Sequence, residues 1–371
     1  MKVLFINGVC GFTSTGRIAC ELADALTTEG HECKIAYGRS EFIPDKWKHY
    51  GVRIGSKMSV KMDALKTRMF DNAGFGSKKA TLCFLEWANE FNPDVLWLHN
   101  LHGYYINIEL LFAWIKERPE MKVKWTLHDC WSFTGHCAHF SYEKCEKWKT
   151  CCEYCEKKHA YPASYFIDNS KCNYENKKRI FSGVKNMTLI TPSNWLAGLV
   201  KQSFLKEYPV EVRYNEIDRN IFKPTVGDFR SKYNIVDKFI VLGVANDWDE
   251  KKGYNDFIEI SGTLPSNCQI VMVGVSKKQI KSMPSNIIGI QKTNDAKELA
   301  EIYTAADVFV NPTYEDNYPT VDLEAEACGT KVICYDAGGT PETIKRKDSI
   351  IVKTGDVDRI IKEIKRMSCR K

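Results

Sequence analysis

The sequence predicts an α/β protein built from two doubly wound domains, each a parallel sheet with helices on both faces. Short apolar runs alternate with segments of helical periodicity along the chain, and this alternation starts again after Pro224. A length of 371 residues also exceeds what one hydrophobic core normally holds. We therefore expect an N-terminal Rossmann-like domain at residues 1–208 and a second one at residues 209–371, joined through "RYNEIDRNIFKPTVGD".

We predict the strands of the first domain from short runs in which consecutive residues are apolar. Such runs are typical of a parallel sheet that is covered by helices on both faces. Between the first two runs, "GRIACELADALTTEG" predicts a helix with Ile18, Leu22 and Leu26 on one face and Gly30 as its stop. A Cys-rich insertion occupies about residues 130–160. The predicted strands are residues 2–7, 32–38, 94–100, 122–129 and 187–193.

The second domain repeats the same alternation. Strands are predicted at residues 239–245, 268–275, 287–291, 307–312 and 331–336, and helices at residues 254–264, 296–306 and 320–329. Ligands of doubly wound sheets bind at the carboxyl ends of the strands. Two such domains facing each other predict an active site in the cleft between them.

Composition excludes several classes of protein. Hydrophobic content of 44% and charged content of 27% are typical of a soluble globular chain. The net charge of +6 is spread along the sequence, which disfavours a nucleic-acid partner but suits anionic substrates or an anionic membrane surface. Without an eighteen-residue apolar run or a signal peptide, we expect a cytoplasmic protein.

Two loops after predicted strands carry residues that suit phosphate. "NGVCGFTSTGR" opens the first helix, and Gly16 with its neighbouring glycines would let a phosphate approach backbone N–H groups. Its spacing fits neither the dinucleotide fingerprint nor the P-loop, so a simple tight turn explains it equally well. "NDWDEKKGYNDF" places Lys251 and Lys252 after the first strand of the second domain, where they could hold a diphosphate or be solvated surface.

A run of carboxylates surrounds Pro319 in "NPTYEDNYPTVDLEAEACGTKVI". The spacing predicts a short helix with Thr320 as N-cap, Glu324 facing inward, and Asp322 and Glu326 facing outward. Glu324 could compensate the helix dipole or accept hydrogen bonds from a vicinal diol.

These residues resemble the retaining nucleotide-sugar glycosyltransferases of family 4, which have the GT-B fold. The resemblance rests on Glu315, "DNYP", Glu324 and "AEACGTKVI", and "TPSNWLAGLVKQSFL" and "VLGVANDWDEKKGYNDF" extend it over essentially the whole chain. "HNLHGYY" and "HDCWSFTGHC" are similar to bacterial members that build surface polysaccharides of the colanic-acid and capsule type.

The resemblance implies specific roles for residues of this chain. Catalytic roles fall to Glu315, His128 and Lys252, with Asp316 as the alternative first acidic residue. The donor would be a UDP- or GDP-type sugar nucleotide and the acceptor a saccharide or lipid-linked saccharide, and no cofactor is needed for catalysis. The implied donor-binding residues are Glu324, Lys251, Asn317, Tyr318, Pro319, Thr320, Val321 and Gly16.

The insertion predicts a structural zinc site. Cys152-x-x-Cys155 has the spacing of metal ligands, and Cys137 and Cys145 could complete a tetrahedral set of four thiolates. Reduced thiols without a metal are the alternative, because a chain without an export signal should keep its 15 cysteines reduced.

A Met-rich segment offers a possible peripheral membrane contact. In "SKMSVKMDALKTRMF", residues 56–70, a helix would gather four apolar side chains on one face and three basic ones along its edge. A stripe that faces the core is the more common meaning of this pattern. The apolar residues are Met58, Met62, Leu65 and Met69, and the basic ones are Lys57, Lys61 and Arg68.

Two other functions stay open at this point. A GT-B relative with other chemistry, such as an epimerase or a phosphorylase, would have similar motifs. An inactive binding scaffold is suggested by Asp247 and Glu216, which stand where the resembled family prefers Arg and Gly.

Overall fold

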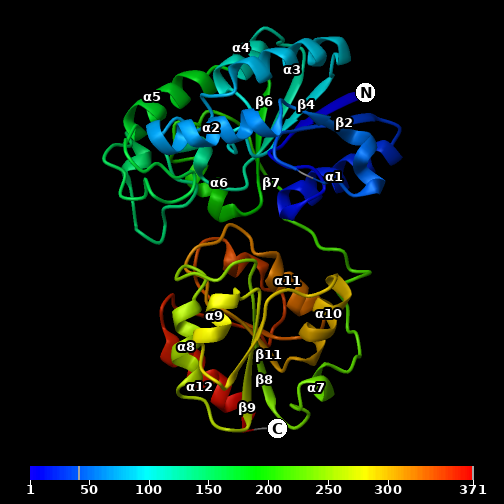
Figure 1. Ribbon diagram of the computed structural model, residues 1–371, viewed down its shortest axis with the longest axis vertical. Coiled ribbons are helices and arrows are strands. Elements are labelled where there is room, and N and C mark those ends of the chain that lie inside the picture. The colour runs from blue at the N-terminus through cyan, green and yellow to red at the C-terminus, as the bar shows by residue number, and fades with distance from the viewer. Residues whose placement is uncertain (41, 370–371) are drawn as a thin grey trace. The chain divides into compact units, whose positions relative to one another are not determined.

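A computed structural model describes residues 1–40 and 42–369, which form two units, Met1–Arg213 and Tyr214–Lys371 (Figure 1). The sequence prediction put the boundary five residues earlier, between residues 208 and 209. The difference arises because Val210–Val212 forms the last strand of the first sheet, so the first unit continues to Arg213.

The first unit contains a seven-stranded, all-parallel sheet in the order β3-β2-β1-β4-β5-β6-β7. Its strand order reverses at β1, which lies between β2 and β4. The strands are β1 (Lys2–Ile6), β2 (Glu32–Tyr37), β3 (Gly51–Arg53), β4 (Val95–Leu98), β5 (Lys122–Thr126), β6 (Met187–Thr191) and β7 (Val210–Val212).

Helices cover both faces of this sheet (Figure 1). Leu4 and Ile6 face one core, shared with α3 (Lys78–Phe91), α4 (Ile108–Lys116), α5 (Ser170–Phe181) and α6 (Asn194–Val200). Val3 and Phe5 face the other, with α1 (Thr13–Thr28) and the 3-10 helix η1 (Asp45–Tyr50). Residues 3–6 of β1 are all buried and face the two cores alternately, as expected for a strand covered on both sides. The remaining helix is α2 (Lys57–Phe70), and two short 3-10 turns are η2 (Trp131–Phe133) and η3 (Lys147–Lys149).

The first helix was predicted correctly, and Leu22 and Leu26 of its predicted apolar face pack against the core, although only partly buried. Gly30 follows the helix with φ of +86°, a left-handed conformation that suits glycine after a C-cap. The fully buried side chains are Ala19, Cys20 and Ala23, which let the helix approach the sheet closely. Ile18, Leu22 and Leu26, the predicted face, are only half-buried along the edge of this contact.

The second unit contains a six-stranded parallel sheet in the order β10-β9-β8-β11-β12-β13. Its strands are β8 (Phe239–Val244), β9 (Cys268–Val273), β10 (Ile287–Ile290), β11 (Val308–Asn311), β12 (Val332–Tyr335) and β13 (Ile350–Val352). Two cores lie on its two faces. The helices are α7 (Phe229–Lys232), α8 (Tyr254–Ser261), α9 (Lys277–Ser282), α10 (Ala296–Ala305), α11 (Thr320–Ala327) and α12 (Val357–Ser368), and η4 (Thr340–Thr343) is a 3-10 helix.

Both units are therefore doubly wound, as the sequence predicted. Each has a point where the strand order reverses, between β1 and β4 in the first and between β8 and β11 in the second. The crevice beside such a point is where open α/β sheets bind ligands. Among the described residues, no helix is both long enough and apolar enough to cross a membrane.

Candidate functional site

In the second unit, the predicted donor-binding residues gather at the switch point between β8 and β11. The loop after β8 is tied to the loop after β11 by a hydrogen bond from the Tyr314 N–H to the Lys251 carbonyl, 2.7 Å long. Gly253 adopts a φ of +75°, and a Cβ there would lie 2.5 Å from the Pro312 carbonyl oxygen. A glycine is needed at this position because the two loops touch through their backbones.

This contact brings two lysines against two carboxylates. Lys252 Nζ donates to Asp316 Oδ2 at 2.6 Å, and Lys251 Nζ lies 3.6 Å from Glu315 Oε2. Burial alone would lower the pKa of Lys252, but the charge and hydrogen bond of Asp316 raise it above its ordinary value. Lys252 is thus a cation held at the carboxyl edge of the sheet. Both acidic candidates are engaged, each with its own lysine.

The N-terminus of α11 lies directly after these carboxylates in the chain. The prediction that Thr320 caps this helix is wrong, because Pro319 occupies the N-cap position and Thr320 is the first helical residue. The Tyr318 N–H instead bonds to Asp316 Oδ1 at 3.2 Å, which fixes the turn into the helix. The first turn of any α-helix presents backbone N–H groups without helical acceptors, so this end of α11 attracts anions.

Glu324 is buried on α11 as predicted, and its Oε2 accepts a hydrogen bond of 3.0 Å from the Tyr303 hydroxyl. The outward placement predicted for Asp322 is wrong. Asp322 is completely buried, with its carboxylate bonded to Asn311 Nδ2 and Thr343 Oγ1, both at 2.8 Å. Burial raises the pKa of Asp322 to about 7.

Glu326 is half-buried rather than free. Its carboxylate accepts hydrogen bonds from the backbone N–H groups of Lys345 and Arg346. Of the three helical carboxylates, each therefore has a separate partner. The sequence did not reveal this because the partners belong to other elements, 11 to 21 residues away on either side in the chain.

In the first unit, His128 lies just after β5 and is partly exposed. Its Nε2 is 2.8 Å from Nδ1 of His99, which follows β4, and the two rings are stacked with centroids 5.1 Å apart. Burial lowers the pKa of His128 to about 4 and that of His99 well below its ordinary value. At neutral pH His128 is therefore uncharged and can act by hydrogen bonding rather than by charge.

A second histidine network beside it was missed by the sequence analysis. His102 Nε2 lies 2.7 Å from Asp129 Oδ2, and its Nδ1 lies 3.1 Å from the Tyr161 hydroxyl, which also accepts a bond from Arg39. Burial alone would raise the pKa of Asp129, but His102 lowers it to about 2. His102 belongs to "HNLHGYY" and Asp129 to "HDCW", whereas Arg39 and Tyr161 lie in other segments, and only the fold brings the four residues together.

Gly16 lies inside α1, where it packs against the loop that precedes the helix. A Cβ there would lie 3.0 Å from Val9 Cγ2 and 3.3 Å from the Gly11 nitrogen. The Gly11 N–H donates to the Gly16 carbonyl at 3.2 Å. This packing accounts for the glycine by local sterics, and its contact with a phosphate stays a prediction.

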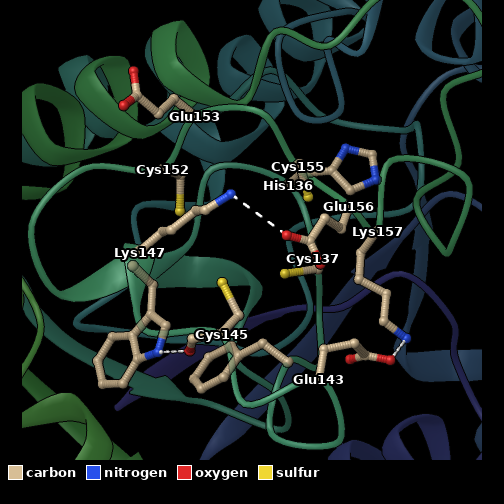
Figure 2. Close-up of a pocket in the computed structure, with 12 residues that line it drawn as sticks. His136, Cys137, Glu143, Cys145, Lys147, Cys152, Glu153, Cys155, Glu156 and Lys157 are labelled. Carbon is tan, nitrogen blue, oxygen red and sulfur yellow. Dashed lines mark hydrogen bonds and ion pairs between the residues drawn. The ribbon is translucent and has the colours of Figure 1, made fainter.

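The four cysteines predicted to bind zinc all line one small cavity in the insertion (Figure 2). A hydrogen bond with the Cys137 thiol lowers the pKa of Cys155 to about 7. In the part of the chain that the structure describes, no three His, Cys, Asp or Glu side chains stand ready to hold a metal ion. The zinc site therefore stays a prediction.

Comparison with known proteins agrees with this geometry. Residues 226–368, which lie entirely in the second unit, match the family described as glycosyl transferases group 1. The chain is 23% identical to the putative colanic acid biosynthesis glycosyl transferase WcaC of Escherichia coli K12, over 97% of this chain and 89% of its relative. It is also 30% identical to the N,N'-diacetylbacillosaminyl-diphospho-undecaprenol α-1,3-N-acetylgalactosaminyltransferase of Campylobacter jejuni, over 34% of each chain.

Solved structures show the same fold. Sucrose-phosphate synthase from Thermosynechococcus elongatus matches with a TM-score of 0.70 and 16% identity, over 99% of this chain and 89% of that one. Anabaena Alr3699/HepE in complex with UDP matches with a TM-score of 0.63 and 12% identity, over 98% of this chain and 89% of that one.

The two doubly wound sheets thus give the chain the GT-B fold. The similarity of residues 226–368 to group 1 glycosyl transferases, together with these relatives, supports a glycosyltransferase enzyme.

Proposed function

We propose that this glycosyltransferase transfers a hexose-type sugar, with retention of anomeric configuration, from a nucleoside-diphosphate donor to a saccharide acceptor during synthesis of a cell-surface polysaccharide. The observation that carries the proposal is the pairing of Lys252 with Asp316 and of Lys251 with Glu315 beside the N-terminus of α11. The relatives named for colanic acid biosynthesis and for an undecaprenol-linked acceptor support a polysaccharide product and a lipid-linked acceptor.

The donor diphosphate would be held by Lys252 and by the first turn of α11. Departure of a nucleoside diphosphate develops negative charge on its oxygens, and a fixed cation with aligned N–H groups stabilises that charge. Lys252 would exchange Asp316 for a phosphate oxygen. Glu315 and Asp316 would then accept hydrogen bonds from sugar hydroxyls, and Glu324 would do so from the ribose.

The uncharged His128 would serve as a hydrogen-bonding partner of the transferred sugar. Because its pKa is lowered to about 4, His128 is uncharged at neutral pH. It would therefore not repel the positive charge that develops on the sugar ring. Loss of the leaving group would be assisted by Lys252 and α11, and in this scheme the leaving phosphate accepts the acceptor proton. We assign no catalytic metal in this scheme, in which Lys252 and the first turn of α11 face the diphosphate.

The surface of α2 supports contact with a membrane that carries the acceptor. The sequence pattern left open whether its apolar stripe faces the core, and the structure turns it outward: Met58 is 67% exposed and Leu65 51% exposed. The buried side of the helix instead contains Asp63 and Thr67. Tyr165, whose N–H bonds to the Arg68 carbonyl, extends the exposed apolar surface with Phe166 and Ile167.

Donor transfer tests the site assignment. The full chain would be screened by thermal shift with UDP-, GDP- and ADP-sugars, and transfer would then be measured with the best donor. Lys252→Ala should lower kcat/KM by about 10²–10³-fold, as expected for one lost electrostatic donor. Lys281→Ala on α9, an exposed lysine outside the switch point, is the matched control and should retain activity.

The product distinguishes the remaining functions. If the enzyme retains configuration, NMR of the product should show that the new glycosidic bond has the same anomeric configuration as the donor. Turnover of a sugar nucleotide without any acceptor would instead identify an epimerase. If the Lys252→Ala and Glu324→Gln variants fold and keep full activity, this site assignment is wrong. If the protein binds a donor but turns over none, it is an inactive binding scaffold.

A further inference from the structure

The Cys-rich insertion encloses a cavity of about 30 Å³ that is separate from both switch points (Figure 2). Pockets for small-molecule substrates are usually several hundred Å³, whereas a single water needs only about 10–15 Å³. The cavity is therefore of a size for an ion. Its lining includes the thiols of Cys137, Cys145, Cys152 and Cys155.

The other polar groups around this cavity already have partners. Glu143 pairs with Lys157, and Glu156 lies 3.8 Å from Lys147. His136 bonds to Asp71 through Nδ1, and its Nε2 faces the Ala160 carbonyl at 3.3 Å. Glu153 lies 3.6 Å from Lys171 Nζ, and Glu143 keeps one buried oxygen, Oε2, without a hydrogen-bond partner among the described residues. The four thiols are therefore the most numerous candidate ligands around the cavity.

Backbone N–H groups point at two of these sulfurs. The Gly135 N–H donates to Cys152 Sγ at 3.2 Å. The Lys157 amide, two residues after Cys155, hydrogen-bonds the thiol of that cysteine. N–H donors to sulfur favour a thiolate over a neutral thiol, and such outer contacts orient the ligands of metal sites.

A buried lysine lies beside the cavity. Lys177 on α5 is only 1% exposed; its Nζ donates to the carbonyls of Trp131 and Thr134 and lies 3.5 Å from the centre of the Trp131 ring. Neither carbonyl carries a full negative charge, and a buried ammonium is costly without one. Burial lowers the pKa of Lys177 to about 7, and a negative charge on Cys152 would raise it.

We propose that Cys137, Cys145, Cys152 and Cys155 bind one Zn²⁺ as a closed structural site, with Lys177 compensating its charge. Four thiols release four protons on binding, so the four thiolates and the zinc together carry a net charge of minus two. The sulfurs do not yet converge on one point. Binding would require the thiols to rotate to other staggered χ1 rotamers so that the four sulfurs converge.

The site would fix the part of the insertion that reaches the histidine network. Tyr161, which bonds to His102 and Arg39, follows Cys155 by six residues in the same insertion. Because four protein ligands leave no open position, the metal would act on folding and positioning rather than on the reaction itself.

Metal content of the full chain tests the proposal. Protein purified under reducing conditions should contain one equivalent of zinc by mass spectrometry of the metal, and Co²⁺ exchanged into it should give the intense thiolate charge-transfer and tetrahedral d–d absorption of a four-thiolate site. Both measurements use the wild-type chain and do not depend on the folding of a variant. Protein without zinc that also gives no such cobalt spectrum would overturn the site.

Variants locate the ligands. Cys152→Ser and Cys155→Ser should each weaken zinc binding at least tenfold. Cys151→Ser is the matched control, because Cys151 adjoins Cys152 but does not line the cavity. Lys177→Met should weaken binding while leaving the tetrahedral cobalt spectrum. Equal loss of zinc in Cys151→Ser, or a disulfide between Cys137 and Cys155 in metal-free protein, would contradict the assignment.

Discussion

Asp322 illustrates how single carboxylates are controlled in the second unit. The Thr343 hydroxyl lies 2.8 Å from Asp322 Oδ2 and 2.6 Å from the Thr340 carbonyl. Hydrogen bonds from the Thr343 hydroxyl and the Asn311 amide favour the ionised carboxylate, but burial outweighs them and raises the pKa of Asp322 to about 7. Asp322 therefore supports α11 most strongly in its neutral form.

Asp322→Asn should remove a pH dependence of stability. An Asp whose folded pKa is about 7 and whose ordinary value is 3.8 stabilises the fold fully below the lower value and loses this contribution as pH rises to the higher one. The wild-type free energy of unfolding should thus fall by a few kcal/mol across this window, since one pKa unit corresponds to about 1.4 kcal/mol. The Asn variant should show a flatter profile in urea titrations at several pH values; parallel profiles would contradict the raised pKa.

His128 gives a prediction for catalysis. With a pKa of about 4, it is neutral throughout the physiological range, and its protonation should not limit activity as pH falls from about 8 to 6. His128→Asn, which keeps a hydrogen-bonding side chain, should therefore retain more activity than His128→Ala without shifting the acid limb of kcat/KM. An acid limb near pH 6.5 that disappears in His128→Asn would show that the histidine titrates normally.

At the scale of the element, α2 departs from an ordinary surface helix. Its capping box, formed by Ser56 and Ser59, starts the helix, and Asp63 bonds to Ser77 on its buried side. The apolar residues that would normally pack inward face solvent. Exposed apolar side chains flanked by cations are typical of helices that lie in a membrane interface.

Vesicle binding tests this role of α2. The full chain should bind vesicles rich in phosphatidylglycerol, and the combined change of Lys57, Lys61 and Arg68 to Ala should weaken binding about a hundredfold, at about tenfold or less per basic residue near an anionic surface. The same number of charges removed from α9, as Lys277, Lys278 and Lys281 to Ala, is the control. If both variants lose the same vesicle affinity, or if high salt does not weaken vesicle binding, the basic residues of α2 do not bind the membrane electrostatically.

At the scale of the whole molecule, the chain has two sets of cores that share no buried residue. Separate cores allow each unit to unfold with its own cooperativity. The proposed donor site lies in the second unit and the proposed zinc site in the first. Ligands of the two sites should therefore stabilise different parts of the protein.

Calorimetry of the full chain should show this separation. A donor nucleotide at about one hundred times its Kd should stabilise one transition by about 2.7 kcal/mol, because it binds only the folded unit. A zinc chelator should lower the other transition. Lys252→Ala should remove the first effect and keep the second. A single transition that responds to both treatments would show that the units unfold together.

The sequence predicted the elements well where burial is periodic and local. The apolar runs of β1, β4, β8 and β11 and the helical pattern of α10 all form where expected. It placed Glu324 inward correctly because one residue's helical face follows from its neighbours. It misplaced Asp322, since the polar partners that bury this carboxylate, Asn311 and Thr343, belong to other elements.

By itself the sequence determined the two doubly wound domains and the group of residues that belongs at the carboxyl edge of the second sheet. The tertiary structure alone decided which of these residues meet: Lys252 reaches Asp316 across 64 residues of sequence because β8 and β11 are neighbours in the sheet. It also decided that the Met-rich face of α2 points to solvent. The hydrophobic periodicity of a sequence shows which face of a single helix or strand is buried. Which side chains meet depends instead on how elements distant in the sequence pack together.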